Sequence, residues 1–204
     1  MQAPMPIVLA DAHVRLVPLV ADDVQEVFAA GRDPRIWELQ NRGPFVDEAD
    51  ARAYVKAALA EVAAGRQLPF VVRDARDGAW LGMTRYMDLQ LDHGGLEIGH
   101  TWLVPAAWCT AVNSAAKRLL LGHAFERLGA ARVCLKTDVR NHRSRRAIER
   151  LGAQHEGIAR HHMRRADGSM RDSVYYSILA DEWPAVRARL EVAAMPAILA
   201  PAGS

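Results

Sequence analysis

Glu97 stands where a carboxylate could accept a proton. It lies in an expected strand, residues 96–104, whose neighbouring residues are mostly apolar. Burial among apolar groups raises the pKa of a carboxylate, which suits it to general-base chemistry. A carboxylate at a solvated strand edge or in a structural salt bridge is the other interpretation. The two-residue period of a strand predicts that Glu97 shares a face with Gly99, Thr101 and Leu103, opposite Ile98 and His100.

Ser144 stands where a hydroxyl could hydrogen-bond a developing charge. Asn141 is a favourable helix N-cap, which makes Ser144 the third residue of the helix that follows. Helical spacing puts Ser144 on one inward face with Ala147, Ile148 and Leu151. The alternative interpretation is a serine that only caps the helix.

The segment from residue 102 to 114 joins an expected strand to a long expected helix. Backbone N–H groups at a helix N-terminus attract anions, and small side chains let a diphosphate approach them. Such loops commonly bind nothing, so the pattern by itself is weak. The candidate contact residues are Trp102, Leu103, Val104, Cys109, Thr110, Ala111, Val112, Asn113 and Ser114.

Arginines gather around the helix that contains Ser144. Arg143 and Arg145 stand in its first turn and are the better candidates for binding phosphates. A solvated basic face explains the same pattern. A nucleic-acid surface is the least favoured interpretation, because aromatic residues are not interleaved with these arginines.

The histidines and cysteines predict no metal site. His161 and His162 are adjacent, so a strand would point them to opposite faces, and no metal-ligand spacing is present. Cys109 lacks a partner base in the sequence, so we interpret it as a small loop residue rather than a nucleophile.

Composition limits the class of protein. The chain has 204 residues, 50% of them hydrophobic, and 26 Lys and Arg balance 24 Asp and Glu. These values predict a globular core and argue against a dedicated DNA-binding domain. Two cysteines cannot form a disulfide framework, which favours a reduced, cytoplasmic setting. No apolar run approaches the length of a membrane helix, and the N-terminus is not a convincing secretory signal.

The elements that must position these residues form a mixed α/β order. We expect strands at 13–19, 68–74, 80–87, 96–104, 132–137, 154–165 and 170–179. We expect helices at 22–31, 47–64, 112–128, 144–151 and 181–191. The central strand, helix and strand predict one parallel pair in a largely antiparallel sheet. We expect a single domain over residues 1–192 and a flexible tail over 193–204.

In order and spacing, the chain resembles the GCN5-related N-acetyltransferase (GNAT) superfamily, in particular its RimJ/RimL-type ribosomal-protein branch. The resemblance covers about residues 13–190. It lies in Leu96–Leu103, Trp108–Ala116, Leu128–Val133, Thr137–Ala153, the Asp167-Gly168 hairpin and the closing strand Tyr175–Ile178.

The resemblance implies a GNAT fold whose parallel strands splay around an acyl-CoA site. It implies acetyl-CoA or another short acyl-CoA as co-substrate, with Glu97 as base, Ser144 as proton donor to the leaving thiolate, and Asn141 at the CoA arm. The branch commonly has Trp-Gly-x-Gly where this chain has Trp108-Cys109-Thr110-Ala111. Cys109 and Ala111 therefore fit only if their backbone is near helical, because glycine serves there for its positive φ and missing Cβ.

The expected function is acyl transfer from CoA to a primary amine by direct attack. The amine would be a small molecule or a protein N-terminus. Its pocket would be lined by the helices near residues 37–45 and by the late hairpin near residues 161–171. Trp37, Arg42 and Phe45 are the candidates there, although they could equally be packing and surface positions. A monomer or homodimer is expected, with no nucleic-acid or membrane partner. The alternative is a catalytically weak acyl-CoA-binding or regulatory protein. The missing glycines favour that alternative, whereas Glu97 and Ser144 together favour the enzyme.

Overall fold

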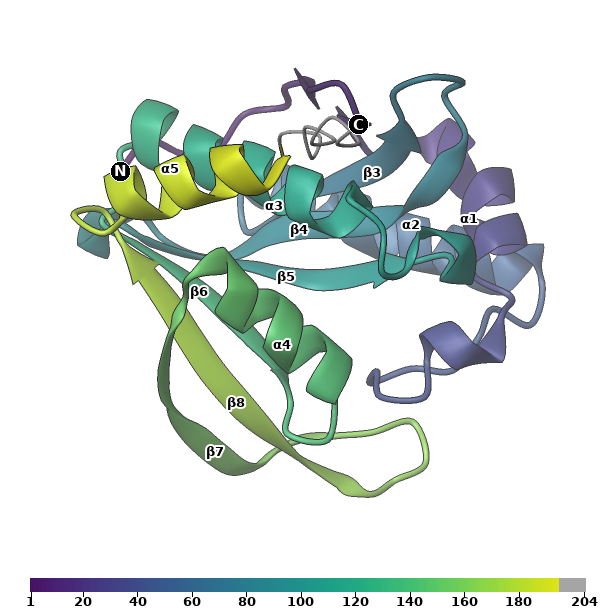
Figure 1. Cartoon of the computed structure of the whole chain (residues 1–204). Helices are drawn as coiled ribbons and strands as arrows, with labels where there is room; N and C mark the ends of the chain where they lie inside the picture. The colour runs from purple at the N-terminus through teal and green to yellow at the C-terminus, as the bar shows by residue number, and fades with distance from the viewer. Residues whose placement is uncertain (195–204) are drawn as a thin grey trace, which may run out of the picture.

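One eight-stranded sheet runs through the chain in the computed structural model, which describes residues 1–194 (Figure 1). The strand order is β1-β2-β3-β4-β5-β6-β8-β7. The strands are β1 Leu9–Ala10, β2 Val14–Pro18, β3 Leu68–Asp74, β4 Trp80–Gln90, β5 Gly95–Leu103, β6 Arg132–Asp138, β7 Gln154–Arg164 and β8 Met170–Leu179.

Five α-helices connect and cover the strands. They are α1 Val24–Ala30, α2 Glu48–Ala63, α3 Val112–Gly122, α4 His142–Leu151 and α5 Trp183–Ala194. Short 3-10 helices occupy Ala21–Asp23, Pro34–Ile36, Leu91–His93 and Pro105–Ala107, and a π-helical turn, His123–Arg127, extends α3.

Local sequence signals set the helix ends. The Asp47 carboxylate accepts a hydrogen bond from the Asp50 N–H at 2.8 Å and so caps α2. Asn141 caps α4 in the same way, and Gly152 ends that helix with a φ of 98°, which favours glycine. The predicted helices 47–64 and 144–151 are therefore confirmed to within two residues.

The predicted parallel pair is confirmed, and it separates soon after it begins. β5 and β6 pair from Gly95 with Arg132 to Glu97 with Cys134, and no further. Beyond Glu97 the two strands diverge, so β6, β8 and β7 swing away from β3, β4 and β5 (Figure 1). This leaves backbone groups on the later half of β5 without a neighbouring strand on that side.

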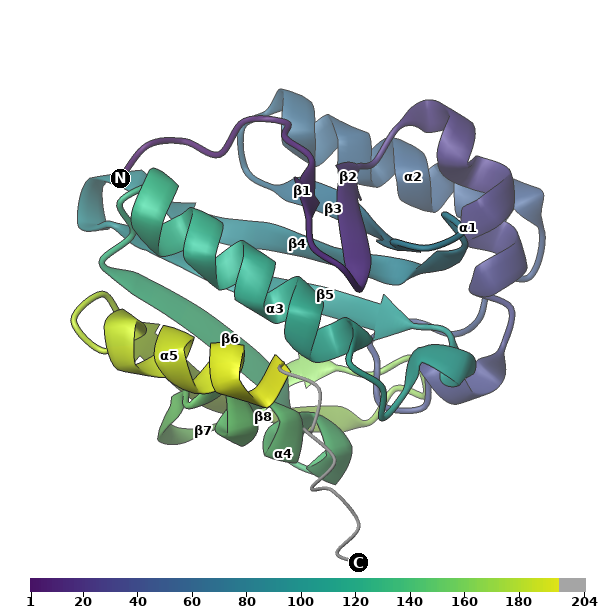
Figure 2. The ribbon, with the colours of Figure 1, turned by 45° about the horizontal axis from the view of Figure 1, so that its top comes forward.

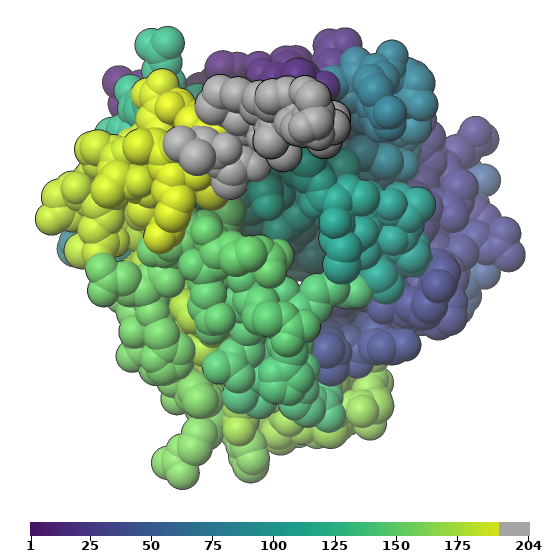
Figure 3. Space-filling view, in the orientation of Figure 1, coloured from purple at the N-terminus to yellow at the C-terminus, as the bar shows by residue number. Residues whose placement is uncertain are grey.

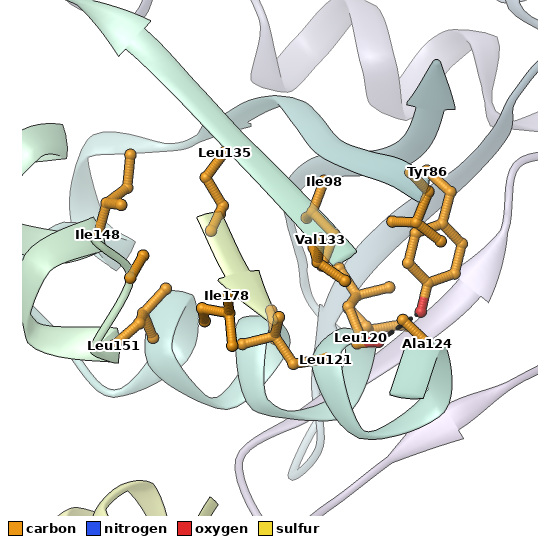
Figure 4. Close-up of a cluster of buried hydrophobic side chains, with 14 of the residues drawn as sticks. Tyr86, Ile98, Leu120, Leu121, Ala124, Val133, Leu135, Ile148, Leu151 and Ile178 are labelled. Carbon is orange, nitrogen blue, oxygen red and sulfur yellow. Dashed lines mark hydrogen bonds between the residues drawn. The ribbon is translucent and has the colours of Figure 1, made fainter. Parts of the chain in front are cut away.

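Helices cover both faces of the sheet (Figure 2). α3 and α5 cover a large core that includes Tyr86, Ile98 and Leu121, and α4 adds Ile148 to the same core (Figure 4). The Tyr86 hydroxyl donates to the Leu120 carbonyl at 2.6 Å and ties β4 to α3. α1 and α2 cover the other face around a second core that includes Trp102. Burial of these apolar groups supplies the main driving force for folding.

The structure adds elements that the sequence patterns missed, namely β1, the 3-10 helices and the change to a π-helical turn within the expected helix 112–128. α5 runs to Ala194, so the predicted tail begins inside it, and residues 195–204 lie outside the described part. Over residues 1–194, no helix combines the length and the apolar character needed to span a bilayer.

Candidate active site

A cavity of about 820 Å³ opens where β5 and β6 separate. Its walls come from residues 35–42, the later half of β5, the loop before α3, the end of β6 and one face of α4. Figure 3 shows the hollow between the teal segment before α3, the green α4 and the violet-blue segment after α1. The cavity therefore brings together segments that lie between residues 35 and 171 of the chain.

Glu97 lines the cavity although only 2% of the residue is exposed. Its Oε2 lies 2.8 Å from Lys136 Nζ on β6. Burial raises the pKa of Glu97, and the hydrogen bond and charge of Lys136 oppose that rise. A β-carbon at Gly99 would overlap Glu97 Oε1, so the glycine makes room for this carboxylate. The geometry supplies a desolvated carboxylate beside the cavity.

A β-bulge in β5 interrupts the alternation of side chains that the sequence predicts. Trp102 pairs with Met83 and Gly99 pairs with Arg85, so two residues of β5 oppose one of β4, and His100 takes a φ of 48°. The extra residue reverses the faces. Thr101 therefore contacts Lys117 on the α3 side, whereas Trp102 joins the core beneath α1 and α2. The prediction that Thr101 and Leu103 share the face of Glu97 is wrong for this reason.

The predicted inward face of α4 is confirmed. Ser144, Ala147, Ile148 and Leu151 all line the cavity. The cap is the Asn141 Oδ1, which accepts the Ser144 N–H at 3.0 Å. The Ser144 hydroxyl itself has no hydrogen-bond partner within residues 1–194, so it is available to a bound molecule. Asn141 also lines the cavity.

The loop before α3 is partly as expected. Cys109, Thr110, Asn113 and Ser114 line the cavity, as do Trp102 and Leu103 from β5. Val104, Ala111 and Val112 are not among the lining residues. Ala111 is helical, with φ −67° and ψ −16°, but Cys109 has a φ of 60°. The condition that both backbones be near helical is met by Ala111 and not by Cys109, which adopts a conformation that favours glycine.

The start of α3 offers donors to an anion. The N–H groups of Asn113 and Ser114 have no acceptor among residues 1–194, as is usual in the first turn of a helix. The Thr110 hydroxyl donates to the Ala107 carbonyl at 2.8 Å and accepts from the Val112 N–H, which fixes the entry to the helix. Together with the helix dipole, these groups form an anion-binding end.

The two arginines singled out from the sequence have different positions. Arg143 lines the cavity, and its guanidinium carbon lies 3.8 Å from the centre of the Trp108 ring. Arg145 is not a lining residue and bonds to other parts of the protein. Its Nε donates to the Tyr176 hydroxyl and its Nη1 to the Val139 carbonyl, both at 3.3 Å. Only Arg143 of this pair reaches the cavity.

On the opposite wall, Trp37 and Arg42 line the cavity and Phe45 lies behind them, 3% exposed. The Arg42 guanidinium carbon lies 3.8 Å from the Phe45 ring centre and also faces Trp37 and Tyr54. Asp50 holds the same guanidinium at 2.7 Å. Phe45 therefore supports this wall instead of facing the cavity.

Sequence reasoning missed three cationic residues of the cavity, Arg35, Lys117 and Lys136. Arg140 belongs to the arginines expected around the Ser144 helix, and Arg171 ends the late hairpin expected at the acceptor pocket. A signal existed for Lys117, which shares helical spacing with Leu120, Leu121 and Ala124, all fully buried. Its Nζ donates to Thr101 Oγ1 at 2.7 Å and to Thr84 Oγ1 at 3.2 Å. Burial lowers the pKa of Lys117 to about 7. The position of Lys136 beside Glu97 depends on how the diverging strands β5 and β6 face one another.

The adjacent histidines engage neighbouring side chains. The His162 ring lies between Ser173 Oγ and Tyr175 Oη, each at 3.0 Å, while His161 uses its backbone N–H to reach Asp172. In the part of the chain that the structure describes, no group of three or more His, Cys, Asp or Glu side chains is arranged to hold a metal ion.

Comparison with known proteins agrees with this geometry. The model of the acetyltransferase (GNAT) domain matches residues 13–154. YdaF of Bacillus subtilis (strain 168), named as a ribosomal N-acetyltransferase, is 36% identical over 107 residues, which are 52% of this chain and 57% of YdaF. The chain thus matches little more than half the length of that relative.

Solved structures give the same result for the whole fold. A GCN5-related N-acetyltransferase from Brucella melitensis superposes with a TM-score of 0.89 at 28% identity, covering 99% of this chain and 91% of the other. RimJ of Mycobacterium smegmatis, solved with CoA-disulfide, superposes with a TM-score of 0.80 at 22% identity, covering 95% and 97%, which shows a shared fold. Because the domain model matches well over half of its residues, the chain belongs to the GNAT acetyltransferase family, as its sequence predicts.

Proposed function

We propose that this protein is an N-acetyltransferase that moves an acetyl group from acetyl-CoA to a primary amine by direct attack. The observation that carries the proposal is one cavity lined both by the Glu97 carboxylate and by the Ser144 hydroxyl, which makes no hydrogen bond to the described residues. Family membership and the splayed β5 and β6 strands support the same activity.

The residues at the α3 end fit the CoA moiety. The free N–H groups of Asn113 and Ser114 suit the diphosphate, and Arg143 supplies a nearby cation. The unpaired edge of β5 offers backbone donors and acceptors to the amides of the CoA arm. RimJ of Mycobacterium smegmatis, which shares this fold, was solved with CoA-disulfide, and this supports CoA as the kind of ligand. Another short acyl-CoA would fit the same groups.

In the proposed reaction, the amine nitrogen forms a bond to the thioester carbonyl carbon and the carbon–sulfur bond breaks. Glu97 accepts the proton that the amine loses, because its burial raises the pKa of its carboxyl. Ser144 donates a hydrogen bond or proton to the leaving thiolate from α4. Positioning in the cavity supplies the remainder of the rate.

The acceptor is an amine of a small molecule or a protein N-terminus, entering beside Trp37 and Arg42. The name of YdaF supports a protein acceptor. We propose that the protein acts in the cytoplasm as a monomer or homodimer.

One observation favours the alternative, an acyl-CoA-binding protein with weak catalysis. Cys109 occupies a left-handed conformation at a position where the family commonly has glycine, which strains the loop that would contact the diphosphate.

Two measurements separate the proposals. Thermal-shift titration with acetyl-CoA and succinyl-CoA tests binding, and a screen of amines with detection of the released thiol tests transfer. The enzyme proposal expects both signals, with transfer lost in Glu97→Gln while acetyl-CoA binding stays. Binding without transfer to any amine supports the binding protein, and no binding of either acyl-CoA rejects both.

A further inference from the structure

Arg171, on β8, is a buried cation of the cavity that has no anionic partner in the described part of the chain. The residue is 7% exposed and lines the cavity. Its Nε is buried without a hydrogen-bond partner, and its Nη1 makes a long contact of 3.4 Å with Asn41 Oδ1. No Asp or Glu within residues 1–194 forms an ion pair with it.

The surrounding acidic groups are already engaged. Both oxygens of Asp138 are used, because Arg165 Nε and Nη2 lie 2.7 and 2.6 Å from Oδ2 and the Arg140 N–H donates to Oδ1. Glu97 is paired with Lys136. Burial therefore lowers the pKa of Arg171, since the desolvation of its guanidinium is not offset by a contacting carboxylate.

The position of Arg171 assigns it to the acceptor side. Its contact Asn41 belongs to the segment between α1 and α2, and Asn41 Nδ2 in turn contacts the Met163 sulfur on β7 at 3.2 Å. This junction lies on a different wall from the α3 N-terminus and Arg143, where we place the CoA phosphates.

The cavity as a whole favours anions. Among the residues that the structure describes, two carboxylates line it, Glu38 and Glu97. Its cationic lining side chains are Arg35, Arg42, Lys117, Lys136, Arg140, Arg143, Arg150 and Arg171. A planar guanidinium with free N–H groups matches the two oxygens of a carboxylate or the oxygens of a phosphate.

We propose that Arg171, assisted by Asn41, binds an anionic group of the acceptor, so that the amine substrate carries a carboxylate or a phosphate close to its amino group. The inference rests on the proposed acyl-transfer function and narrows its substrate class. Bound acceptor supplies the counter-charge that the protein itself does not provide, which orients the amine toward Glu97.

Matched acceptor pairs test the inference. Glutamate and O-phosphoethanolamine are compared with glutamine amide and ethanolamine, and a peptide amide that begins with Glu is compared with one that begins with Gln. Thiol release from acetyl-CoA and thermal shift in the presence of CoA are measured for every compound. The carboxylate, phosphate and peptide arms distinguish the possible sources of the anion.

We expect at least one anionic member to bind and react better than its neutral partner. In Arg171→Gln this preference falls about 10- to 100-fold because the KM for the anionic acceptor rises. This is the size expected when a hydrogen bond between charged groups is lost. Neutral acceptors lose less than anionic ones, and Arg171→Lys restores part of the preference. Arg164→Gln, an exposed arginine of the same hairpin, is the matched control and keeps the preference.

Three results overturn the inference. They are equal binding of anionic and neutral partners by the parent protein, equal losses for both in Arg171→Gln, or a lowered melting temperature in that variant with the preference intact. If no amine reacts, the thermal shifts still decide whether Arg171 selects anions, so failure of the proposed function is seen separately from failure of this inference.

Discussion

Lys136 Nζ lies 2.8 Å from Glu97 Oε2, across the junction where β5 and β6 make their last pair. The ion pair thus joins the two strands at the point of divergence and places a charge-paired carboxylate in the lining of the cavity. Burial raises the pKa of Glu97 and the Lys136 pair opposes that rise, so both act on the protonation of this carboxylate.

The first prediction concerns the pH dependence of acyl transfer. Burial raises the pKa of Glu97, so this carboxyl takes up its proton at a higher pH than an ordinary glutamate does. Below that pH it cannot accept the proton of the amine. Glu97→Gln should remove this acidic limb of kcat/KM and lower the rate by about 10²- to 10⁴-fold. Lys136→Met should move the limb to higher pH, because Lys136 opposes the rise in pKa. A limb that survives unchanged in Glu97→Gln belongs to another group.

The second prediction concerns Ser144. Ser144→Ala should lower kcat by about 10- to 1,000-fold with little change in CoA affinity. Since the cap of α4 is the Asn141 side chain and the Ser144 N–H, the alanine variant should keep its stability. Asn141→Ala is the matched comparison and should lose about 1 kcal/mol of unfolding free energy. A parent-like kcat in Ser144→Ala would remove the proton-donor role.

The third prediction separates two arginines. Arg143→Ala should weaken CoA binding about 3- to 10-fold, and more at low salt, because its charge faces the cavity. Arg145→Ala should leave CoA affinity unchanged, since Arg145 is held by Tyr176 and Val139. Calorimetric titration at two salt concentrations checks both, and equal losses in the two variants would contradict the assignment.

The fourth prediction concerns strain at Cys109. A left-handed residue with a side chain costs about 1–2 kcal/mol, which glycine avoids, but the greater entropy that glycine gives the unfolded chain cancels part of that gain. Cys109→Gly should therefore be more stable than Cys109→Ala by about 0.5–1 kcal/mol in urea unfolding. Cys109→Gly should also bind CoA more tightly. If the glycine and alanine variants unfold alike, the loop carries no strain.

The fifth prediction concerns Lys117 and pH. Its pKa is about 7 in the folded protein against 10.5 as the ordinary value, so between these pH values the unfolded chain binds a proton that the folded chain does not. The contribution of Lys117 to stability therefore rises with pH across that window, and at neutral pH and below it is unfavourable. The gain in unfolding free energy of Lys117→Met over the parent should be largest at pH 7 and smallest near pH 10. Parallel stability curves for the two proteins would contradict this.

Local sequence signals were sufficient for much of the framework. The carboxylate of Asp47, the amide of Asn141 and the glycine at 152 act within a few residues of themselves, so the helix ends that they set are readable from the chain. The order of strand, helix and strand through β5, α3 and β6 likewise predicts the parallel pair. The cavity-facing side of α4 follows from helical spacing alone.

Other features depend on contacts between distant segments. The bulge at His100 arises from the register of β5 against β4, and it moves Thr101 and Trp102 to faces that alternation does not predict. Arg143 and Arg145 are two residues apart and chemically alike, yet only the positions of Trp108 and Tyr176 decide which one reaches the cavity. Arg171 is left without a carboxylate because Arg165 engages Asp138. The partners in such pairs are separated by tens of residues in the chain. Their contacts are therefore fixed only when the strands and helices pack together in the folded protein.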